Sequence, residues 1–362
     1  MRDDSLDLNA GWDPERIGLI LPTSLGGIVQ SLPVLSALRE RFSEASITAI
    51  VSREYAELID GHPLVSGVIE YDRHGPLILW RKLMNQLLRP RFGMTVDFHG
   101  LLRTGIMARV TKAPVRIGLE SAREVARFAY TRTLPDSGPL VPETQRFWRL
   151  AEHFGLGNHR GSAGITISHT DRNWVRARLD AFRRPLIAVH PGAGWDTKRW
   201  PIEKFAVAAC KTIRRYGGVA IVLGRDAEQG TASQFAELMY KFIPARPVVN
   251  LAGSTSLKQL AAVLEQSDCL LSNDSGPMHL AASLGTRVVS VFTCTSPLIS
   301  GPAGPHHQPV SSCVACHASY HKRCPKRGSR HMACMEDVTT ERVVNALRLV
   351  LDERIDEIRR AA

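Results

Sequence analysis

The sequence lacks several features that mark special classes of protein. No apolar run is long enough to span a bilayer, and residues 1–7 lack the apolar core of a secretion signal. We find no internal repeat and no low-complexity tract in the 362 residues. The composition, with 44% hydrophobic and 22% charged residues, is ordinary for a globular protein that is long enough for two cores. We therefore expect a cytoplasmic protein.

Acidic residues are scarce relative to basic ones. The chain has 35 Asp and Glu residues against 46 Lys and Arg residues, which gives a formal net charge of +11. Such an excess indicates an acidic partner: nucleic acid, an anionic membrane or a phosphorylated substrate. Aromatic residues form only 6% of the chain and do not interleave with the arginines as they would on a surface that stacks bases. We therefore expect a compact anionic substrate and no nucleic acid.

Short apolar runs alternate with helical patterns along the chain, and this alternation is typical of an α/β fold with parallel sheets. The predicted strands span residues 17–21, 47–51, 95–98, 186–190, 219–223, 248–251, 269–271 and 288–292. The first helix is predicted to begin near Ser31 and Pro33, and the last spans residues 340–359. Residues 158–163 have the composition of a linker.

The stretch from Asn273 to Gly285 predicts a strand end, a polar turn and a short helix. A helix start presents unpaired N–H groups and a positive dipole end, which favour a bound anion. Asp274, Ser275 and His279 would surround such a site. The alternative interpretation is that Asp274 and Ser275 only cap the helix.

Two more loops carry candidate ligand-binding residues after predicted strands. Lys198 follows the glycine-containing stretch 191–194, where small residues let backbone N–H groups approach an anion. Glu228 follows the strand at 219–223, a place where a carboxylate commonly binds a ribose. Because the carboxyl ends of parallel strands form the ligand crevice of an α/β sheet, the three loops together favour binding over capping.

Residues 76–92 combine an apolar face with Arg81, Lys82, Arg89 and Arg91. A helix on an anionic membrane has this pattern, and so does a helix that faces a protein core and has a solvated edge. Four cysteines near the C-terminus leave a second question open. A structural zinc ion at Cys313, Cys316, Cys324 and Cys334, or free thiols, would both suit these residues.

Several stretches together resemble the heptosyltransferases, GT-B glycosyltransferases of family 9 that build the inner core of lipopolysaccharide. They occur in the family's order over nearly the whole chain, at residues 23–26, 97–101, 121–124, 190–192, 198–201, 224–228 and 273–280. The resemblance implies two Rossmann-like domains that face each other across a cleft. It implies an N-terminal acceptor domain at 1–165, a C-terminal donor domain with a Cys-rich tail at 166–339, and a helix at 340–362 that packs back on the N-terminal domain.

The resemblance also implies the substrates: ADP-heptose or a related nucleotide sugar as donor, and a lipid A-linked core oligosaccharide as acceptor. The protein would contact the cytoplasmic face of the inner membrane, and transfer would invert the anomeric centre without a metal or another cofactor. Arg123 resembles an acceptor-binding residue, and Lys198, Asp274 and His279 resemble catalytic residues. The implied donor-binding residues are Thr23, Ser24, Gly194, Lys198, Glu228, Thr255, Asp274, Ser275, Gly276 and His279.

One position departs from the family. Heptosyltransferases carry an Asp as general base after the Ser-Leu-Gly turn, and here that position is Gly27. A general base contributes about 10²-fold to 10⁴-fold, so Asp97 or His99 would have to replace it. The alternatives are a nucleotide-sugar-binding homologue with impaired catalysis and a transferase of another nucleotide sugar. If only the base is missing, Gly27→Asp is expected to restore activity.

Overall fold

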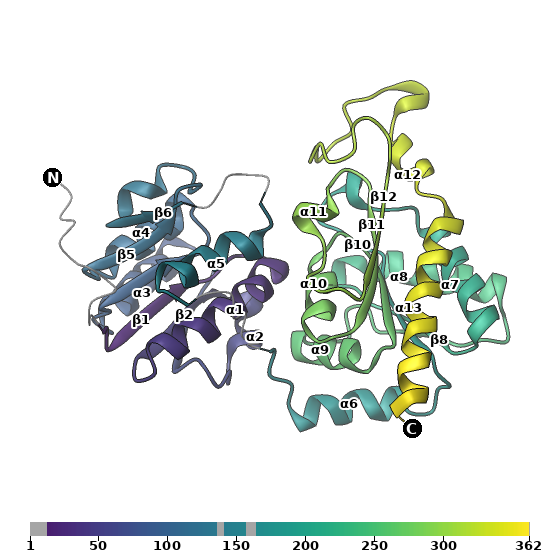
Figure 1. The fold of residues 1–362 in the computed structure, drawn as a ribbon, viewed down its shortest axis with the longest axis horizontal. Helices are drawn as coiled ribbons and strands as arrows, with labels where there is room; N and C mark the ends of the chain where they lie inside the picture. The colour runs from purple at the N-terminus through teal and green to yellow at the C-terminus, as the bar shows by residue number, and fades with distance from the viewer. Residues whose placement is uncertain (1–12, 136–140, 157–163, 362) are drawn as a thin grey trace. The chain divides into compact units, whose positions relative to one another are not determined.

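The structure is a computed structural model that describes residues 13–135, 141–156 and 164–361 (Figure 1). The chain divides into two compact units, Met1–Thr166 and Ile167–Ala362. Each unit holds one six-stranded sheet, and the paired strands are parallel throughout. The expectation of two Rossmann-like α/β domains is therefore confirmed. The linker expected at 158–163 lies outside the described residues.

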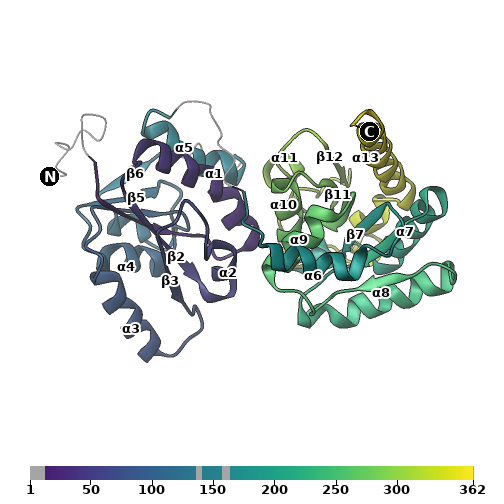
Figure 2. The ribbon, with the colours of Figure 1, turned by 90° about the horizontal axis from the view of Figure 1, so that it is seen from below.

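The N-terminal sheet has the strand order β3-β2-β1-β4-β5-β6. Its strands are β1 (Arg16–Ile20), β2 (Ser46–Ser52), β3 (Gly67–Tyr71), β4 (Met94–Asp97), β5 (Val115–Leu119) and β6 (Arg132–Leu134). Its helices are α1 (Leu25–Arg41), α2 (Ala56–Ile59), α3 (Leu77–Leu88), α4 (Leu102–Val110) and α5 (Glu143–His153), with 3₁₀ turns η1 (Arg53–Tyr55) and η2 (Ala126–Ala129). Figure 2 shows α1 and α5 on one face of this sheet, and α3 and α4 on the other.

The first helix begins earlier than the sequence predicts. It starts directly after Ser24, whose backbone is extended and whose Oγ accepts a hydrogen bond from the N–H of Gly27 at 3.1 Å. Pro33, which the prediction used as a start signal, lies inside the helix. The expected start near Ser31 is therefore wrong, because the capping serine determines this helix end. Gly27 consequently belongs to the first turn of α1.

The C-terminal sheet has the strand order β12-β11-β10-β7-β8-β9. Its strands are β7 (Leu186–His190), β8 (Val219–Val222), β9 (Val248–Asn250), β10 (Cys269–Asn273), β11 (Arg287–Phe292) and β12 (His307–Ser311). Its helices are α6 (His169–Leu179), α7 (Ile202–Tyr216), α8 (Gln229–Phe242), α9 (Leu257–Gln266), α10 (Gly276–Ser283), α11 (Pro297–Ser300), α12 (Ala333–Asp337) and α13 (Thr340–Ala361). The 3₁₀ turns are η3 (Asp196–Lys198), η4 (Asp226–Glu228) and η5 (Gly328–Arg330). The four central strands β7, β8, β10 and β11 are fully buried, as expected for a parallel sheet that helices cover on both faces, whereas the edge strands β9 and β12 are partly exposed.

The C-terminal helix packs within its own unit. Helix α13 contacts α7 and strands β10, β11 and β12, and its apolar residues Val343 and Leu347 are completely buried there (Figure 1). Arg287, buried at the start of β11, donates to Glu353 at 2.6 Å and to Glu357. The apolar side of α13 therefore lies on the C-terminal sheet, and the expected packing of this helix on the N-terminal domain stays a prediction.

None of the helices in the described ranges is both long enough and apolar enough to cross a membrane.

Candidate active site

The strand order of the C-terminal sheet reverses between β7 and β10, and we call this position the branch of the sheet. These strands are neighbours, with Ser272 in register with His190. The chain nevertheless leaves β7 toward β8 and β9, and leaves β10 toward β11 and β12. At such a branch the loops after the two central strands diverge and leave a crevice at their carboxyl ends. A ligand is therefore expected beside the residues that follow β7 and β10.

Lys198 and Asp274 meet at this branch. Lys198 ends η3 in the loop after β7, and Asp274 is the first residue after β10. The Nζ atom of Lys198 lies 2.7 Å from Oδ2 of Asp274, and the two side chains are 17% and 5% exposed. Lys198, which the sequence predicts to lie in a loop after a strand, thus lies near the start of α10. An ammonium in this position suits an anionic group that docks on the same helix end.

His279, the third predicted catalytic residue, lies in α10 behind this ion pair and is 8% exposed. Burial is the main cause that lowers the pKa of His279 to about 4, and the charge of Lys198 lowers it further, whereas Asp274 opposes the shift. The imidazole is therefore neutral near neutral pH. It therefore adds no positive charge to the site.

Ser275, His190 and Glu228 form a chain of side chains from three loops. The Oγ atom of Ser275 lies 3.2 Å from Nδ1 of His190, and Nε2 of His190 lies 3.7 Å from Oε2 of Glu228. Burial by itself would raise the pKa of Glu228. The hydrogen bond and charge of His190, with the backbone N–H and charge of Arg225, outweigh burial and lower it to about 2. Glu228 is thus a fully ionised acceptor for hydroxyl groups.

The amino end of α10 is not closed by a side chain. Ser275 occupies the N-cap position, but its side chain makes no capping hydrogen bond, because its hydroxyl contacts His190 instead. The interpretation that this serine only caps the helix is therefore wrong. Helix α10 begins at Gly276, Pro277 has no N–H, and the N–H of Met278 donates to the carbonyl of Ser275 at 3.2 Å. The N–H of Gly276 and the positive end of the helix dipole therefore remain for an anion.

The sequence analysis did not predict His190, Trp195 or Lys322 as site residues. The Nζ atom of Lys198 lies 4.5 Å from the centroid of the Trp195 ring, and Nζ of Lys322 lies 5.3 Å from it. Cations over an aromatic face are held by the charge distribution of the ring. The Cys-rich segment therefore brings a second ammonium near Lys198. Only the strand-end position of His190 gives a local signal, since Lys322 is far from Trp195 in the sequence.

The remaining predicted donor-binding residues lie at other places. Gly194 is exposed in the loop after β7, and a Cβ atom there would have no neighbour within 4 Å. Thr255 is half-buried in the loop between β9 and α9. Thr23 and Ser24 belong to the N-terminal unit, where Ser24 caps α1.

The N-terminal sheet branches in the same way, between β1 and β4. Thr23 follows β1 and His99 follows β4, and their Oγ1 and Nε2 atoms lie 3.2 Å apart. Burial, the largest effect, and the charges of Arg103, Arg123 and Arg73 lower the pKa of His99 to about 4, against the opposing effect of Glu124. Arg123, which is predicted to bind the acceptor, thus lies with Arg103 and Arg73 near the neutral imidazole of His99. Such a cluster suits an anionic group.

Asp97 has a structural role in this unit. Its Oδ1 accepts hydrogen bonds from the N–H groups of His99 at 2.8 Å and Gly100 at 3.1 Å, and its Oδ2 accepts one from the hydroxyl of Tyr130 at 2.7 Å. The side chain is buried, and burial raises its pKa. Asp97 therefore holds the turn after β4 and cannot reach a substrate, which corrects its expected role as a substitute base.

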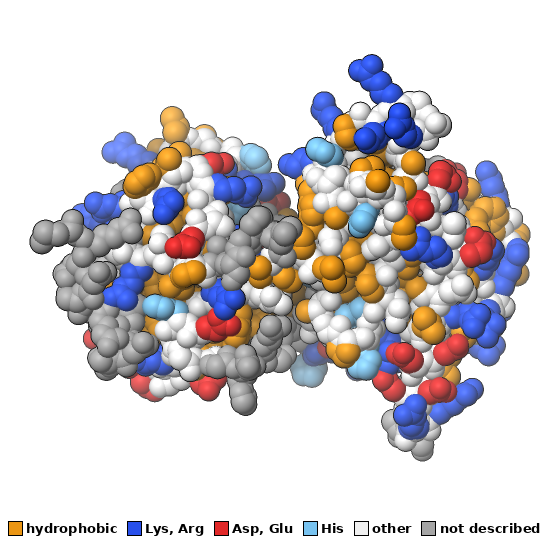
Figure 3. Space-filling view, turned by 45° about the horizontal axis from the view of Figure 1, so that its top comes forward, with side chains coloured by type: hydrophobic (Ala, Val, Ile, Leu, Met, Phe, Trp, Pro, Cys, Tyr) orange, Lys and Arg blue, Asp and Glu red, His pale blue; other side chains and the backbone are white. Residues whose placement is uncertain are grey.

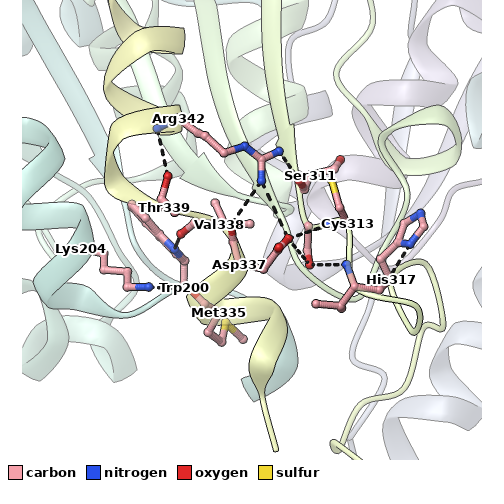
Figure 4. Close-up of polar contacts among 12 residues, drawn as sticks. Trp200, Lys204, Ser311, Cys313, His317, Met335, Asp337, Val338, Thr339 and Arg342 are labelled. Carbon is pink, nitrogen blue, oxygen red and sulfur yellow. Dashed lines mark hydrogen bonds and ion pairs between the residues drawn. The ribbon is translucent and has the colours of Figure 1, made fainter. Parts of the chain in front are cut away.

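Cys313 is fixed through its backbone (Figure 4). Its N–H donates to Oδ2 of Asp337 at 2.6 Å, and the same carboxylate accepts from the hydroxyl of Ser312 and lies 3.8 Å from the Arg342 guanidinium. This contact ties the strand β12 to the segment before α13. In the described parts of the chain, no three His, Cys, Asp or Glu side chains are arranged to hold a metal ion.

The thiols that affect the pKa of Cys334 differ from the expected set of zinc ligands. Burial raises the pKa of Cys334 to about 11, and the neighbouring thiols that add to this shift are Cys294, Cys316 and Cys324. Cys294 follows strand β11 and was not part of the prediction, whereas Cys313 is exposed. The expected zinc ligands Cys313, Cys316, Cys324 and Cys334 are therefore not assembled in this structure.

Residues 80–329, more than half of the chain, match the model of glycosyltransferase family 9 (heptosyltransferase). The lipopolysaccharide core heptosyltransferase OpsX of Haemophilus influenzae is 26% identical over 296 residues, which are 80% of this chain and 82% of OpsX. The solved ADP-heptose lipopolysaccharide heptosyltransferase II of E. coli has a TM-score of 0.75 at 21% identity and covers 93% of this chain and 99% of its own. The E. coli heptosyltransferase WaaC, solved with ADP-2-deoxy-2-fluoro heptose, has a TM-score of 0.68 at 19% identity, with 93% and 99% covered.

Proposed function

Because the chain belongs to glycosyltransferase family 9, the heptosyltransferases, we propose that it transfers heptose from ADP-heptose to a lipopolysaccharide inner-core acceptor, either Kdo-lipid A or a heptosyl core. The observation that carries the proposal is the Lys198–Asp274 pair at the uncapped start of α10. This arrangement offers a phosphate site and a sugar-binding carboxylate side by side. The relatives named above are heptosyltransferases, and one of them was solved with an ADP-heptose analogue.

The donor is assigned to the C-terminal unit. The diphosphate of ADP docks at the start of α10, on the N–H of Gly276 and the helix dipole, beside the ammonium groups of Lys198 and Lys322. Glu228, held ionised by His190, accepts hydrogen bonds from the ribose hydroxyls. Asp274 binds hydroxyls of the heptose, and Thr255 lines the adenine pocket.

The chemistry proposed is direct displacement at the anomeric carbon with inversion. The acceptor oxygen forms the new bond while the bond between the anomeric carbon and the diphosphate oxygen breaks, and ADP leaves with the bonding electron pair. Negative charge therefore grows on the diphosphate. Preorganised cations and a helix dipole stabilise that charge as it develops, which is the largest contribution in many enzymes. Lys198 and α10 supply both.

The acceptor is assigned to the N-terminal unit. Arg73, Arg103 and Arg123 act on the same imidazole of His99, so they form a cationic cluster beside the turn after β4. The inner core of lipopolysaccharide carries carboxylate and phosphate groups, and guanidinium groups bind both through paired hydrogen bonds.

The N-terminal unit also carries a surface that suits a lipid-linked acceptor. Helix α3 packs on α4, and α4 packs on the turn η2. Large apolar side chains on these elements, or directly before them, are exposed. We call this set the apolar patch: Leu77, Ile78, Leu102, Ile106, Val125 and Phe128. Exposed Arg81, Lys82, Arg109 and Arg127 lie on the same elements, and Figure 3 shows hydrophobic and basic side chains next to one another on this unit. We assign the patch to the anionic cytoplasmic face of the inner membrane.

The experiment that tests the function combines the purified protein with ADP-heptose and Kdo-lipid A and follows ADP release and the mass of the lipid. Acceptor-dependent ADP release with a heptose added to the lipid is the expected result. Stabilisation by UDP or GDP sugars but not by ADP-heptose, in a thermal-shift panel of nucleotide sugars, would overturn the donor assignment.

Gly27 favours a second candidate, a nucleotide-sugar-binding protein without turnover. This protein would bind ADP-heptose with ordinary affinity and release no ADP when Kdo-lipid A or heptosylated core is added. The same ADP-release assay, run beside a direct binding titration, separates the two candidates.

A further inference from the structure

A carboxylate from another helix lies beside the turn in which the family's base is missing. The amide Nε2 of Gln30, on α1, lies 3.2 Å from the carbonyl oxygen of Gly26 and 3.3 Å from Oε2 of Glu143. Gln30 follows Gly27 by almost one helical turn, so the two share a face of α1. Glu143 therefore reaches the face of the helix where heptosyltransferases carry their aspartate.

The fold holds Glu143 in place from two sides. It is the first residue of α5, and α5 packs along α1. The next turn of α5 carries Arg146, whose guanidinium donates to the hydroxyl of Ser121, after β5. Glu143 is half-buried as a residue, and the amide of Gln30 contacts its carboxylate.

Glu143 is also electrostatically suited to take a proton. Burial is the largest effect and raises its pKa above the ordinary value for Glu, while the charges of Arg146 and Arg123 oppose this shift. A carboxylate whose pKa moves toward neutrality is a stronger base that is still ionised at neutral pH. The charge of Arg123 affects the pKa of both Glu143 and His99, so this carboxylate lies near the cationic cluster of Arg73, Arg103 and Arg123.

The other candidate bases of this unit are weaker. The oxygens of Asp97 are occupied by Tyr130 and by two backbone N–H groups. The imidazole of His99 has a pKa of about 4, which makes it a poor proton acceptor near neutral pH.

We propose that Glu143 is the general base of the transfer reaction, in place of the aspartate that is absent at Gly27. The proposal rests on the proposed heptosyl transfer. Glu143 takes the proton of the attacking acceptor hydroxyl as its oxygen bonds to the anomeric carbon, and ADP leaves with the electron pair of the broken bond. The protonated Glu143 then returns its proton to water.

The first test compares Glu143→Gln with wild type in the ADP-release assay. We expect kcat to fall by about 10²-fold or more, with the ADP-heptose dissociation constant unchanged. Glu152→Gln is the matched control, because Glu152 lies on the same helix, is 40% exposed and pairs with the exposed Arg149 at 2.6 Å. Activity of Glu143→Gln within about threefold of wild type would overturn the proposal, and so would a larger loss in His99→Gln.

A second measurement separates a base from a structural carboxylate. Formate added to Glu143→Ala is expected to raise the ADP-release rate by about tenfold or more, because a small carboxylate enters the vacated space and takes the proton. Formate should not change Glu152→Ala or wild type. A Glu143→Ala protein that melts like wild type, is inactive and does not respond to formate speaks against the base role.

The pH profile of the wild-type protein gives a third readout, which needs no variant. If Glu143 is the base, the acid limb of kcat lies above the ordinary pKa of Glu, whereas a limb near pH 4 would match His99 and contradict the proposal. If the wild-type protein binds the donor but transfers no sugar to any acceptor, the proposed transferase function is wrong. If the wild-type protein is active and Glu143→Gln is equally active, only the proposed role of Glu143 is wrong.

Discussion

The carboxylate of Glu228 occupies the space that a side chain at Gly192 would need. A Cβ atom on Gly192 would stand 2.1 Å from Oε1 and 2.6 Å from Cδ of Glu228. Glycine is thus required here for close approach and not for an unusual turn. Gly192 follows His190 by two positions, so the loop after β7 gives Glu228 both its partner and its space.

Gly192→Ala is therefore expected to displace Glu228 and weaken donor binding. A hydrogen bond to a charged group is worth about 1.5 to 3 kcal/mol, so the dissociation constant of ADP should rise by about tenfold to 100-fold in calorimetric titration. Gly230→Ala is the matched control, since a Cβ atom at Gly230 on α8 has no neighbour within 4 Å. Affinity of Gly192→Ala within about twofold of wild type would show that Glu228 does not bind the ribose.

Lys198→Met should abolish turnover and also lower stability. The variant loses the cation that we place beside the diphosphate, and it leaves the nearly buried Asp274 without its partner at 2.7 Å. Loss of one member of a buried pair costs about 3 to 5 kcal/mol, which urea unfolding measures. Lys198→Met with Asp274→Asn should regain stability without regaining activity.

Lys211→Met is the control for the lysine variant. Lys211 pairs with Glu341 at 2.7 Å, but the side chains are 46% and 68% exposed. An exposed pair contributes about 0 to 1 kcal/mol, so this variant should match wild type in both assays. An active Lys198→Met protein would remove Lys198 from the donor site.

Central strands were predictable because both faces of a parallel sheet are covered and the strands read as plain apolar runs. The strand 186–190 was predicted with the same bounds as β7. The start of α1 was not, since Pro33 resembles a helix start and the serine cap at Ser24 is the weaker local signal.

In the candidate site, too, some features could be predicted from the sequence and others could not. Strand ends and the polar turn at Asp274 locate the loops that matter, because topology places the carboxyl ends of parallel strands together. Contacts between distant segments have no local signature. Ser275 and His190 are 85 positions apart, and Gln30 and Glu143 are 113 apart. The sequence therefore predicted which loops carry the candidate residues but not the hydrogen bonds between them.

Binding to vesicles with anionic lipids should depend on the apolar patch. Leu77 and Phe128 are 86% and 79% exposed, and insertion of each large apolar side chain contributes about 1.5 to 3 kcal/mol. Leu77→Ser with Phe128→Ser should weaken flotation with phosphatidylglycerol vesicles by about 100-fold or more. Tyr240→Ser is the control, because Tyr240 is 68% exposed on α8 of the other unit. Equal vesicle binding by wild type and the double variant would contradict this membrane assignment.

His279 should make stability depend on pH. Its pKa falls from 6.5 in the unfolded chain to about 4 in the folded protein, so the unfolded state binds more protons between these values. The contribution is complete above the unfolded pKa and is lost as pH falls toward 4, which amounts to about 2 kcal/mol between pH 7 and pH 5. Urea unfolding at both pH values should show a smaller loss in His279→Gln. An equal loss in both proteins would mean that His279 titrates normally.

Gly27→Asp should not restore the missing base by itself. A Cβ atom at Gly27 would lie 2.7 Å from Cβ of Pro22 and 2.9 Å from Oγ of Ser24, which caps the same helix. Overpacking of this kind costs about 1 to 3 kcal/mol, so the variant should unfold at lower urea concentration with no gain in ADP release. Pro22→Gly with Gly27→Asp removes the closest contact, which is with Cβ of Pro22, and should recover part of the lost stability. A faster single variant with unchanged stability would instead show that the turn adapts to a side chain, and that the glycine alone limits the rate.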